Sequence, residues 1–440
     1  MSAGKSWRVD RLVLENFRCF DELDIAFDDS FTALVGVNGA GKTAILDALA
    51  VMLSTVLYEL GDSRRGFSPS DVRLVSTVGS SSSVSSMEPA FPVTGAIDAT
   101  LAGSEYWWKR VKASRSGRTS WGDKRLIDNH VSKIWRAASS DAPTAQLPVI
   151  AMYGVERLVG VRRAQGRIQR SRSDAYAAAL DSKSDLTRLS AYIQGLTLDE
   201  YTASTELGNS DSPESRQLAA IRLSCERILA TTGWTGPYWR QNVGELTMIH
   251  SDHGELPLSF LSSGLKITAG LAIDLASRMA RANPTLGGTE LLETVPGIVL
   301  IDEVDLHLHP TWQQRIVPSL RTTFPQVQFI VTTHSPQVLS TVPAQGVRIL
   351  DSTTVGRIQH SEGLRSDVIL REILGTEPQP EVELTQRLRR YLELVDAGKG
   401  LDEEAKKMRQ DLDNELGGAN LVPALADADA AMTFYDLDDE

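Results

Sequence analysis

One stretch of the sequence limits the possible folds more than any other. Residues 36–43 read Gly-Val-Asn-Gly-Ala-Gly-Lys-Thr, which matches the pattern G-x-x-x-x-G-K-[ST]. An apolar run at residues 31–35 precedes the glycines, and apolar residues recur at helical spacing over residues 43–57. A strand, a glycine-rich loop and a helix in this order predict a loop that surrounds phosphate oxygens with backbone N–H groups at a helix N-terminus.

The residue types in this loop indicate how it would bind a nucleoside triphosphate. Glycine permits the tight bend that brings successive N–H groups to one point. The ammonium group of Lys42 would reach the β- and γ-phosphates, and the hydroxyl group of Thr43 would ligate Mg²⁺. A glycine-rich turn that matches the pattern by chance is the alternative. The phosphate-binding residues that we predict are Gly36, Asn38, Gly39, Gly41, Lys42 and Thr43.

A second motif, far along the chain, would supply the other half of the site. Residues 297–301 form a very apolar run, and Asp302 and Glu303 follow it. An apolar strand that ends in two carboxylates is typical of a Walker B motif. Asp302 would then hold Mg²⁺, and Glu303 would polarise a water molecule for attack on the γ-phosphate. Taken alone, the motif could also be a strand capped by two solvated acids.

Two shorter motifs help to define the class of nucleotide-binding protein. Leu-Ser-Ser-Gly at residues 261–264 opens a predicted helix, so Ser262 and the N–H group of Gly264 could offer a second helix N-terminus to an anion. His334 follows a predicted strand at residues 328–332, in the phrase Thr-Thr-His-Ser-Pro. A lone histidine at a strand end is more often structural than catalytic. This one, however, would lie where a γ-phosphate sensor is needed.

In this order, the four motifs resemble those of ABC-type ATPase heads of the RecF/SMC-like class. Within that class, the sequence is similar to the PtuA-type ATPases of Septu and retron-associated antiphage systems. The resemblance is dense over residues 1–60 and 255–345. It is carried by residues 16–20 (Asn-Phe-Arg-Cys-Phe), 302–310 (Asp-Glu-Val-Asp-Leu-His-Leu-His-Pro) and 332–337 (Thr-Thr-His-Ser-Pro-Gln), and by Tyr153, Gly154 and Arg157.

The resemblance implies a P-loop NTPase that uses ATP and Mg²⁺ and forms a head-to-head homodimer or a higher oligomer. ATP held by Lys42 and Thr43 of one chain would meet Ser262 and Gly264 of the other. Asp305 would lie in the dimer-contact loop, and His334 would be the switch histidine. Two features depart from the family pattern: the signature reads LSSGL instead of LSGGQ, and Gln146 precedes the strand that a Q-loop glutamine should follow.

The same resemblance implies a function in antiphage defence. ATP binding and slow hydrolysis would act as a conformational switch, and the chain would be the sensor and regulator of a separate HNH-type nuclease. The alternative is a RecF-like DNA-repair ATPase clamp that binds DNA directly, without a nuclease partner. What activates the system, and whether ATP is hydrolysed or only held, stay open at this stage.

We expect an α/β fold with a split ATPase head, a helical insertion and a C-terminal helical extension. Strands at residues 8–15, 23–27, 96–102 and 107–111 are predicted in the N-terminal half, the last two in an inserted sheet. The predicted regions are residues 1–150 (N-terminal half of the head), 151–250 (arginine-rich segment and helices at 184–196 and 214–231), 251–360 (C-terminal half) and 361–440 (partner-binding extension with helices at 381–396 and 402–416).

Charge is distributed unevenly along the chain. The net charge is −12, but residues 105–172 hold 15 basic and 5 acidic residues, whereas residues 377–440 hold 7 basic and 17 acidic residues. A polyanion would therefore meet the middle of the chain, and a basic protein partner would suit the C-terminal extension. The segment from Arg157 to Arg172 favours a solvated loop, with a nucleic-acid contact through phosphates as the alternative; its arginines are Arg157, Arg162, Arg163, Arg167, Arg170 and Arg172.

Several other classes of protein and site are disfavoured. No run of about 20 apolar residues occurs, so we expect no membrane span and a cytoplasmic location. Cys19 and Cys225 stand too far apart in sequence for a zinc motif. His307 and His309 lack a third ligand placed by the sequence, so a metal site there is also disfavoured.

Overall fold

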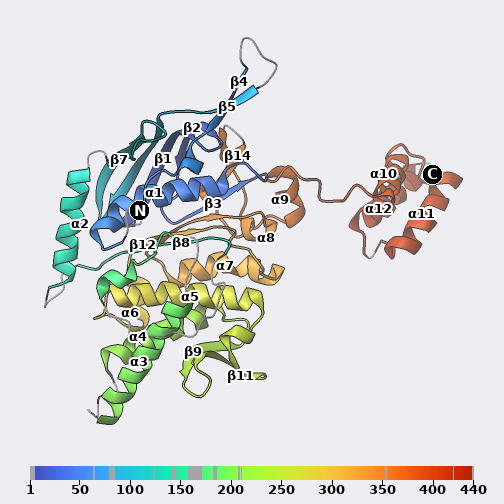
Figure 1. The fold of residues 1–440 in the computed structure, drawn as a ribbon. Helices are drawn as coiled ribbons and strands as arrows, with labels where there is room; N and C mark the ends of the chain where they lie inside the picture. The colour runs from blue at the N-terminus through green and yellow to red at the C-terminus, as the bar shows by residue number, and fades with distance from the viewer. Residues whose placement is uncertain are drawn as a thin grey trace. The chain divides into compact units, whose positions relative to one another are not determined.

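The computed structural model describes residues 5–62, 65–78, 85–121, 124–140, 145–156, 171–181, 186–206, 209, 211–351, 354–419 and 421–438. Contacts divide the chain into two compact units, Met1–Ile369 and Leu370–Glu440. In Figure 1 the larger unit runs in colour from blue to orange, and most of the smaller unit is red. The division falls within a short helix, whereas the sequence predicts the extension to begin at residue 361.

The centre of the larger unit is a six-stranded sheet with the order β15-β14-β3-β13-β12-β8. All its strands are parallel except β15, which is antiparallel to β14. Short, nearly continuous apolar runs are typical of parallel strands that are covered on both faces. The strands are Phe31–Gly36 (β3), Val149–Tyr153 (β8), Gly297–Ile301 (β12), Val327–Thr332 (β13), Val347–Asp351 (β14) and Thr354–Gly356 (β15).

The parallel register brings the carboxyl ends of β3, β12 and β13 to one edge of this sheet. Ile301 of β12 pairs with Val331, and Thr332 of β13 pairs with Leu34 of β3. β3 comes from the N-terminal part of the chain, whereas β12 and β13 come from its C-terminal part. The predicted α/β fold, split between two distant segments, is therefore confirmed.

A second, antiparallel sheet has the order β2-β1-β6-β7. Its strands are Trp7–Phe17 (β1), Phe20–Ala26 (β2), Val93–Leu101 (β6) and Ser104–Lys112 (β7). The expectation that β6 and β7 form an inserted sheet of their own is wrong, because β6 pairs with β1 along most of its length, for example Ile97 with Leu12. Alternate side chains of β1 are buried, and β6 extends the same apolar face.

Helix α1 (Lys42–Glu59) lies between the two sheets (Figure 1). Most of its side chains are buried, and they join the same hydrophobic core as residues of β1, β6, β12 and β13. The helix therefore continues directly from the glycine-rich loop into the middle of the larger unit. Burial on both sides fixes the position of its first turn, where Lys42 and Thr43 lie.

The other face of the six-stranded sheet is covered by helices that include α5 and α7 (Figure 1). α4 packs against α5, α6 and α7, and α3 packs against α4. Besides α1, the helices in the described part of the larger unit are Lys124–Ala138 (α2), Leu186–Glu206 (α3), Pro213–Ile228 (α4), Ser263–Ala282 (α5), Gly288–Thr294 (α6), Pro310–Thr323 (α7) and Pro336–Leu339 (α8). Ser366–Glu372 (α9) spans the division between the units. Single 3-10 turns lie at Pro69–Asp71 (η1), Arg172–Ala175 (η2), Leu258–Phe260 (η3) and Ala344–Gly346 (η4).

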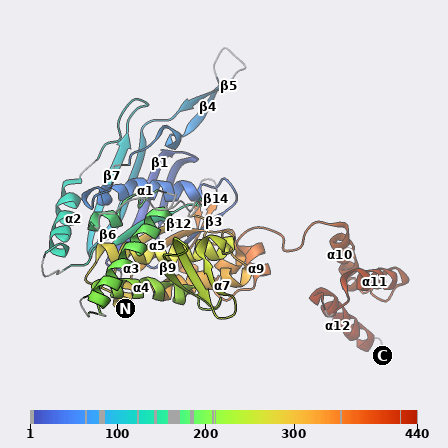
Figure 2. The ribbon, with the colours of Figure 1, turned by 60° about the horizontal axis from the view of Figure 1, so that its bottom comes forward.

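Residues 151–250 contain strands as well as the two helices that the sequence predicts. Trp234–Arg240 (β9), Glu245–His250 (β10) and Gly254–Pro257 (β11) form a small antiparallel sheet beside α3 and α4. The predicted helical insertion therefore contains strands as well as helices. A further hairpin, Leu74–Val78 (β4) with Ser85–Pro89 (β5), extends from the larger unit in both views (Figures 1 and 2).

The smaller unit is a group of three helices, Glu383–Asp396 (α10), Glu403–Leu416 (α11) and Pro423–Asp438 (α12). Its own hydrophobic core includes Leu388, Tyr391, Leu412 and Leu425. The helices predicted at 381–396 and 402–416 are confirmed, and α12 was not predicted. Among the described residues, no helix is both long enough and apolar enough to cross a membrane.

Candidate functional site

The glycine-rich loop joins the end of β3 to the start of α1. Gly41 is the N-cap of α1 and has a left-handed backbone with φ of 92°. A Cβ atom at this position would lie 2.2 Å from Cζ of Phe20 and 2.7 Å from Sγ of Cys19. Only glycine satisfies both the dihedral angle and the close approach. Asn38 and Gly39 are exposed at the crest of the loop, where their N–H groups are available to a phosphate.

The side chain of Lys42 lies across this loop. It is buried, and its Nζ atom donates hydrogen bonds to the carbonyl oxygens of Gly36 at 2.8 Å and Val37 at 2.9 Å. Burial lowers the pKa of Lys42, while the negative charges of Asp302 and Glu303 oppose this shift. The ammonium group therefore lies between the loop and the two carboxylates that follow β12.

Asp302 faces the first turn of α1. The Thr43 hydroxyl group donates to its carboxylate, with Oγ1 at 3.2 Å from Oδ1 and 3.0 Å from Oδ2. Thr332, at the end of β13, donates to Oδ1 at 2.6 Å. The backbone N–H of Asp302 donates to the carbonyl of Tyr153 at 2.8 Å. One hydroxyl and one carboxylate, held at this separation, form the oxygen donor set that suits Mg²⁺.

Glu303 has an unusual backbone conformation for a residue with a side chain. Its φ angle is 47°, in the left-handed region, and its N–H group donates to Oγ1 of Thr332 at 2.7 Å. Such conformations carry an energetic cost and persist where the surrounding structure fixes them. Thr332 thus fixes both acids, since its hydroxyl group donates to Asp302 and accepts from Glu303.

His334 is exposed and lies among the same charged groups. Partial burial lowers its pKa, as does the positive charge of Lys42, while the carboxylates of Asp305, Glu303 and Asp302 oppose the shift. The preceding residue, Thr333, donates from Oγ1 to Oδ1 of Asp305 at 2.6 Å. The histidine segment and the segment after β12 are therefore joined at two points, Thr332 with Asp302 and Thr333 with Asp305.

The signature residues make different contacts. Ser262 is the N-cap of α5, and its side chain accepts from the N–H group of Leu265. A Cβ atom on Gly264 would lie 2.5 Å from the carbonyl oxygen of His307, so only glycine permits this approach. The structure thus brings Lys42, Thr43, Asp302, Glu303 and His334 together. Gly264 of the signature packs instead against the loop that follows Glu303, residues 304–309.

The remaining predicted residues fall in other places. Arg157, Arg162, Arg163, Arg167 and Arg170 lie outside the described residues. Arg172 lies in η2 and donates to the carbonyl of Ala138. Gln146 donates to Oγ1 of Thr294 at 3.0 Å, and His309 caps α7 by accepting from the N–H group of Thr311.

A buried polar network beside the site was not predicted. The Tyr153 hydroxyl donates to Oδ2 of Asp274 at 2.8 Å, and Nε of Arg278 donates to the same oxygen at 2.8 Å. Burial and the neighbouring Asp274 carboxylate raise the pKa of Tyr153 well above its ordinary value. Asp274 and Arg278 belong to α5, the helix that the signature residues begin. The network therefore connects α5 to Tyr153, the last residue of β8, whose carbonyl oxygen accepts from the N–H group of Asp302. The i,i+4 spacing of Asp274 and Arg278 signals their ion pair, but no sequence spacing signals the contact with Tyr153, which lies on a distant element.

Comparisons with known proteins are consistent with this geometry. A family model described as "AAA domain" matches residues 11–209. A second, described as "AAA domain, putative AbiEii toxin, Type IV TA system", matches residues 111–340, which is more than half of the chain.

Individual curated relatives include a retron ATPase and a Septu protein. The chain is 29% identical to "Retron Ec83 probable ATPase" of Escherichia coli, over 94% of this chain and 85% of that protein. It is 35% identical to "Septu protein PtuA" of Bacillus thuringiensis, over 21% of this chain and 23% of that protein. A solved "SmcHead bound to the C-winged helix domain of ScpA" aligns with a TM-score of 0.47 and 18% identity, covering 80% of this chain and 98% of that one. The family models and the retron and Septu relatives confirm the resemblance inferred from the motifs.

Proposed function

This chain belongs to the AAA-domain family, and from that premise we propose that it binds ATP with Mg²⁺ and hydrolyses it slowly as a conformational switch. The observation that carries the proposal is the contact between Thr43 and Asp302, whose Oγ1 and Oδ2 atoms lie 3.0 Å apart although 259 positions separate them in the sequence. A P-loop threonine beside a Walker B aspartate is the arrangement that holds Mg²⁺ on a bound triphosphate.

Each residue of the site has a role in the proposed reaction. The N–H groups of residues 36–43 and the Lys42 ammonium group hold the phosphates, and Mg²⁺ held by Thr43 and Asp302 would neutralise part of their charge. Glu303 accepts a proton from the attacking water, whose oxygen bonds to the γ-phosphorus as the bond to the β–γ bridging oxygen breaks and ADP leaves. His334 donates a hydrogen bond to the γ-phosphate.

We propose that a second copy of the chain closes the site. Ser262 and Gly264 lie at the N-terminus of the long helix α5, where the first-turn N–H groups have no partner within the helix. Ser262 and Ser263 of this turn are exposed, while Gly264 is buried behind them, so the exposed end of the helix can meet the triphosphate of a partner. A partner's helix N-terminus over the γ-phosphate would stabilise negative charge and exclude water.

The experiment that tests the enzyme activity compares two substitutions. Glu303→Gln keeps the shape of the side chain but removes the proton acceptor, so we expect normal MgATP binding and at least about a hundredfold slower hydrolysis. Lys42→Ala removes the ammonium group that holds the phosphates, so both binding and hydrolysis should be lost. Calorimetry would measure binding, and phosphate release would measure the rate. Unchanged hydrolysis by Glu303→Gln would exclude the assigned role of Glu303.

We further propose that the switch controls a separate HNH-type nuclease in antiphage defence. The names of the retron and Septu relatives support this setting, and the acidic three-helix unit is our candidate docking surface for the nuclease. Deletion of residues 377–440 should abolish capture of the nuclease in a pull-down while MgATP binding persists, because the P-loop and Asp302 lie in the other unit. Retained capture would place the docking surface elsewhere.

A further inference from the structure

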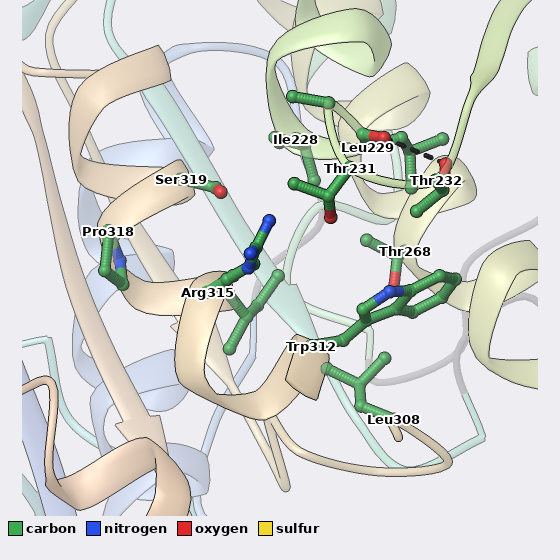
Figure 3. A pocket seen from close by; sticks show the side chains of 12 residues that line it. Ile228, Leu229, Thr231, Thr232, Thr268, Leu308, Trp312, Arg315, Pro318 and Ser319 are labelled. Atoms are coloured by element: carbon green, nitrogen blue, oxygen red, sulfur yellow. Dashed lines mark hydrogen bonds between the residues drawn. The ribbon is translucent and has the colours of Figure 1, made fainter. Parts of the chain in front are cut away.

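A mostly apolar cavity lies behind the signature turn. Figure 3 shows it between the C-terminal end of α4, the beginning of α5 and the helix α7, and its volume is about 250 Å³. Ile228, Leu229 and Ile316 line it with buried apolar side chains. Because ligand pockets for larger molecules usually exceed about 300 Å³, this cavity suits a compact group such as a single fused ring system.

One charged residue lies at the edge of this cavity. Figure 3 shows the guanidinium group of Arg315 directed toward the space between Thr231 and Ser319. Among the described residues that line the cavity, Arg315 is the one with a charge, and it is exposed. A planar guanidinium group at the edge of an apolar cavity favours an anion whose remaining part is apolar.

The wall of the cavity is continuous with the proposed dimer interface. Thr268 lines the cavity, and its Oγ1 atom donates to the carbonyl oxygen of Gly264 at 2.9 Å. Leu308 also lines the cavity, and it directly follows His307, whose carbonyl oxygen packs against Gly264. A group inside the cavity would therefore contact Thr268 and Leu308, which lie beside the signature turn, without entering the nucleotide site.

We propose that this cavity is a regulatory site for a compact amphiphilic anion, a ring or branched aliphatic group that carries one carboxylate, sulfonate or phosphate. The apolar part lies against Ile228, Leu229 and Ile316, and the anionic part accepts hydrogen bonds from Arg315. By filling the space between α4, α5 and α7, the ligand holds the signature turn in one arrangement and lowers the entropy cost of dimerisation. This regulatory part rests on the proposed function, whereas binding to the cavity does not.

Naphthalene-2-sulfonate is a suitable probe, and the neutral 2-naphthalenemethanol is its matched comparison. Calorimetry on the full chain without nucleotide should show that Arg315→Gln weakens sulfonate binding by about tenfold, the usual effect of losing one charge-assisted contact. Arg321→Gln, on the same helix but outside the cavity lining, should leave it unchanged. Binding of the neutral probe should be the same in all three proteins.

Equal affinity of the sulfonate for both arginine variants, or equal affinity of the two probes for the wild-type protein, would overturn the assignment of this site. Saturating sulfonate should also strengthen MgATP-dependent dimerisation by about threefold or more in the wild-type protein. Dimerisation that the probe does not alter would overturn the regulatory part. A wild-type protein that binds no MgATP would contradict the proposed function, while the nucleotide-free titrations would still decide the assignment of the cavity.

Discussion

Asp302 is the residue at which the two distant halves of the candidate site meet. Its carboxylate accepts hydrogen bonds from Thr43 on one side and from Thr332 on the other. The sequence motifs predict the pairing of Thr43 with Asp302. They do not predict the hydrogen bond from Thr332, because a threonine at the end of an apolar strand usually indicates only a β-branched residue that favours the strand conformation. The phrase Thr-Thr-His is a usable signal only once the register of β13 against β12 is known.

At the same scale, the environment of His334 predicts a dependence of MgATP affinity on pH. Burial and the positive charge of Lys42 lower its pKa, so the imidazole is mostly neutral near pH 7. A bound γ-phosphate would favour the protonated form, so binding should take up a proton. Affinity should then rise, by up to about tenfold, as the pH falls from about 8 to about 6.

His334→Gln serves as the matched variant for this prediction, because glutamine keeps a hydrogen-bonding group but does not titrate. Its MgATP affinity should change less with pH than that of the wild-type protein, and the difference isolates His334 from the titration of ATP itself. Calorimetry in buffers of different ionisation enthalpy measures the proton uptake directly. The same proton uptake in both proteins would exclude His334 from contact with the triphosphate.

At the scale of the elements, Gln328 joins the two large sheets. It is fully buried on β13, its Oε1 atom accepts from the N–H group of Val9 at 2.7 Å, and its Nε2 atom donates to the carbonyl oxygens of Val9 and Asp28, each at 2.8 Å. Gln328→Leu would leave these backbone groups buried without partners. We expect the free energy of unfolding of the larger unit to fall by about 2–4 kcal/mol.

Gln326→Leu is the control for this change, since Gln326 is exposed in the turn before β13. It should alter stability by less than about 0.5 kcal/mol. Urea unfolding followed by circular dichroism would compare the two variants. A similar small effect for both would show that the polar contacts of Gln328 do not stabilise the packing of the sheets.

Much of the element order could be predicted from the sequence, because the parallel strands are compact apolar runs and the long helices are periodic. What could not be predicted is mainly non-local. The pairing of Ile97 with Leu12 decides whether β6 belongs to a separate sheet, and no local pattern reports it. The strands β9 to β11 are short and half-polar, so their apolar signal is weak. The network of Tyr153, Asp274 and Arg278 likewise depends on packing between distant elements.

At the scale of the whole molecule, the chain combines an ATPase head of the AAA-domain family with a three-helix unit that has its own core. The head supplies the phosphate loop, the two acids and the histidine. Its signature turn packs against residues 304–309 of the same chain. The site within one chain is therefore half of the arrangement that we propose, and the second half would come from another copy of the chain.

Sedimentation velocity of Glu303→Gln, with and without MgATP, tests this central claim most directly. If a triphosphate held by Lys42, Thr43 and Asp302 is closed by Ser262 and Gly264 of a second copy, saturating MgATP should convert the protein into a stable dimer or a multiple of one. The double variant Glu303→Gln and Lys42→Ala should not respond to MgATP. An assembly state that is unchanged by saturating MgATP would contradict the account.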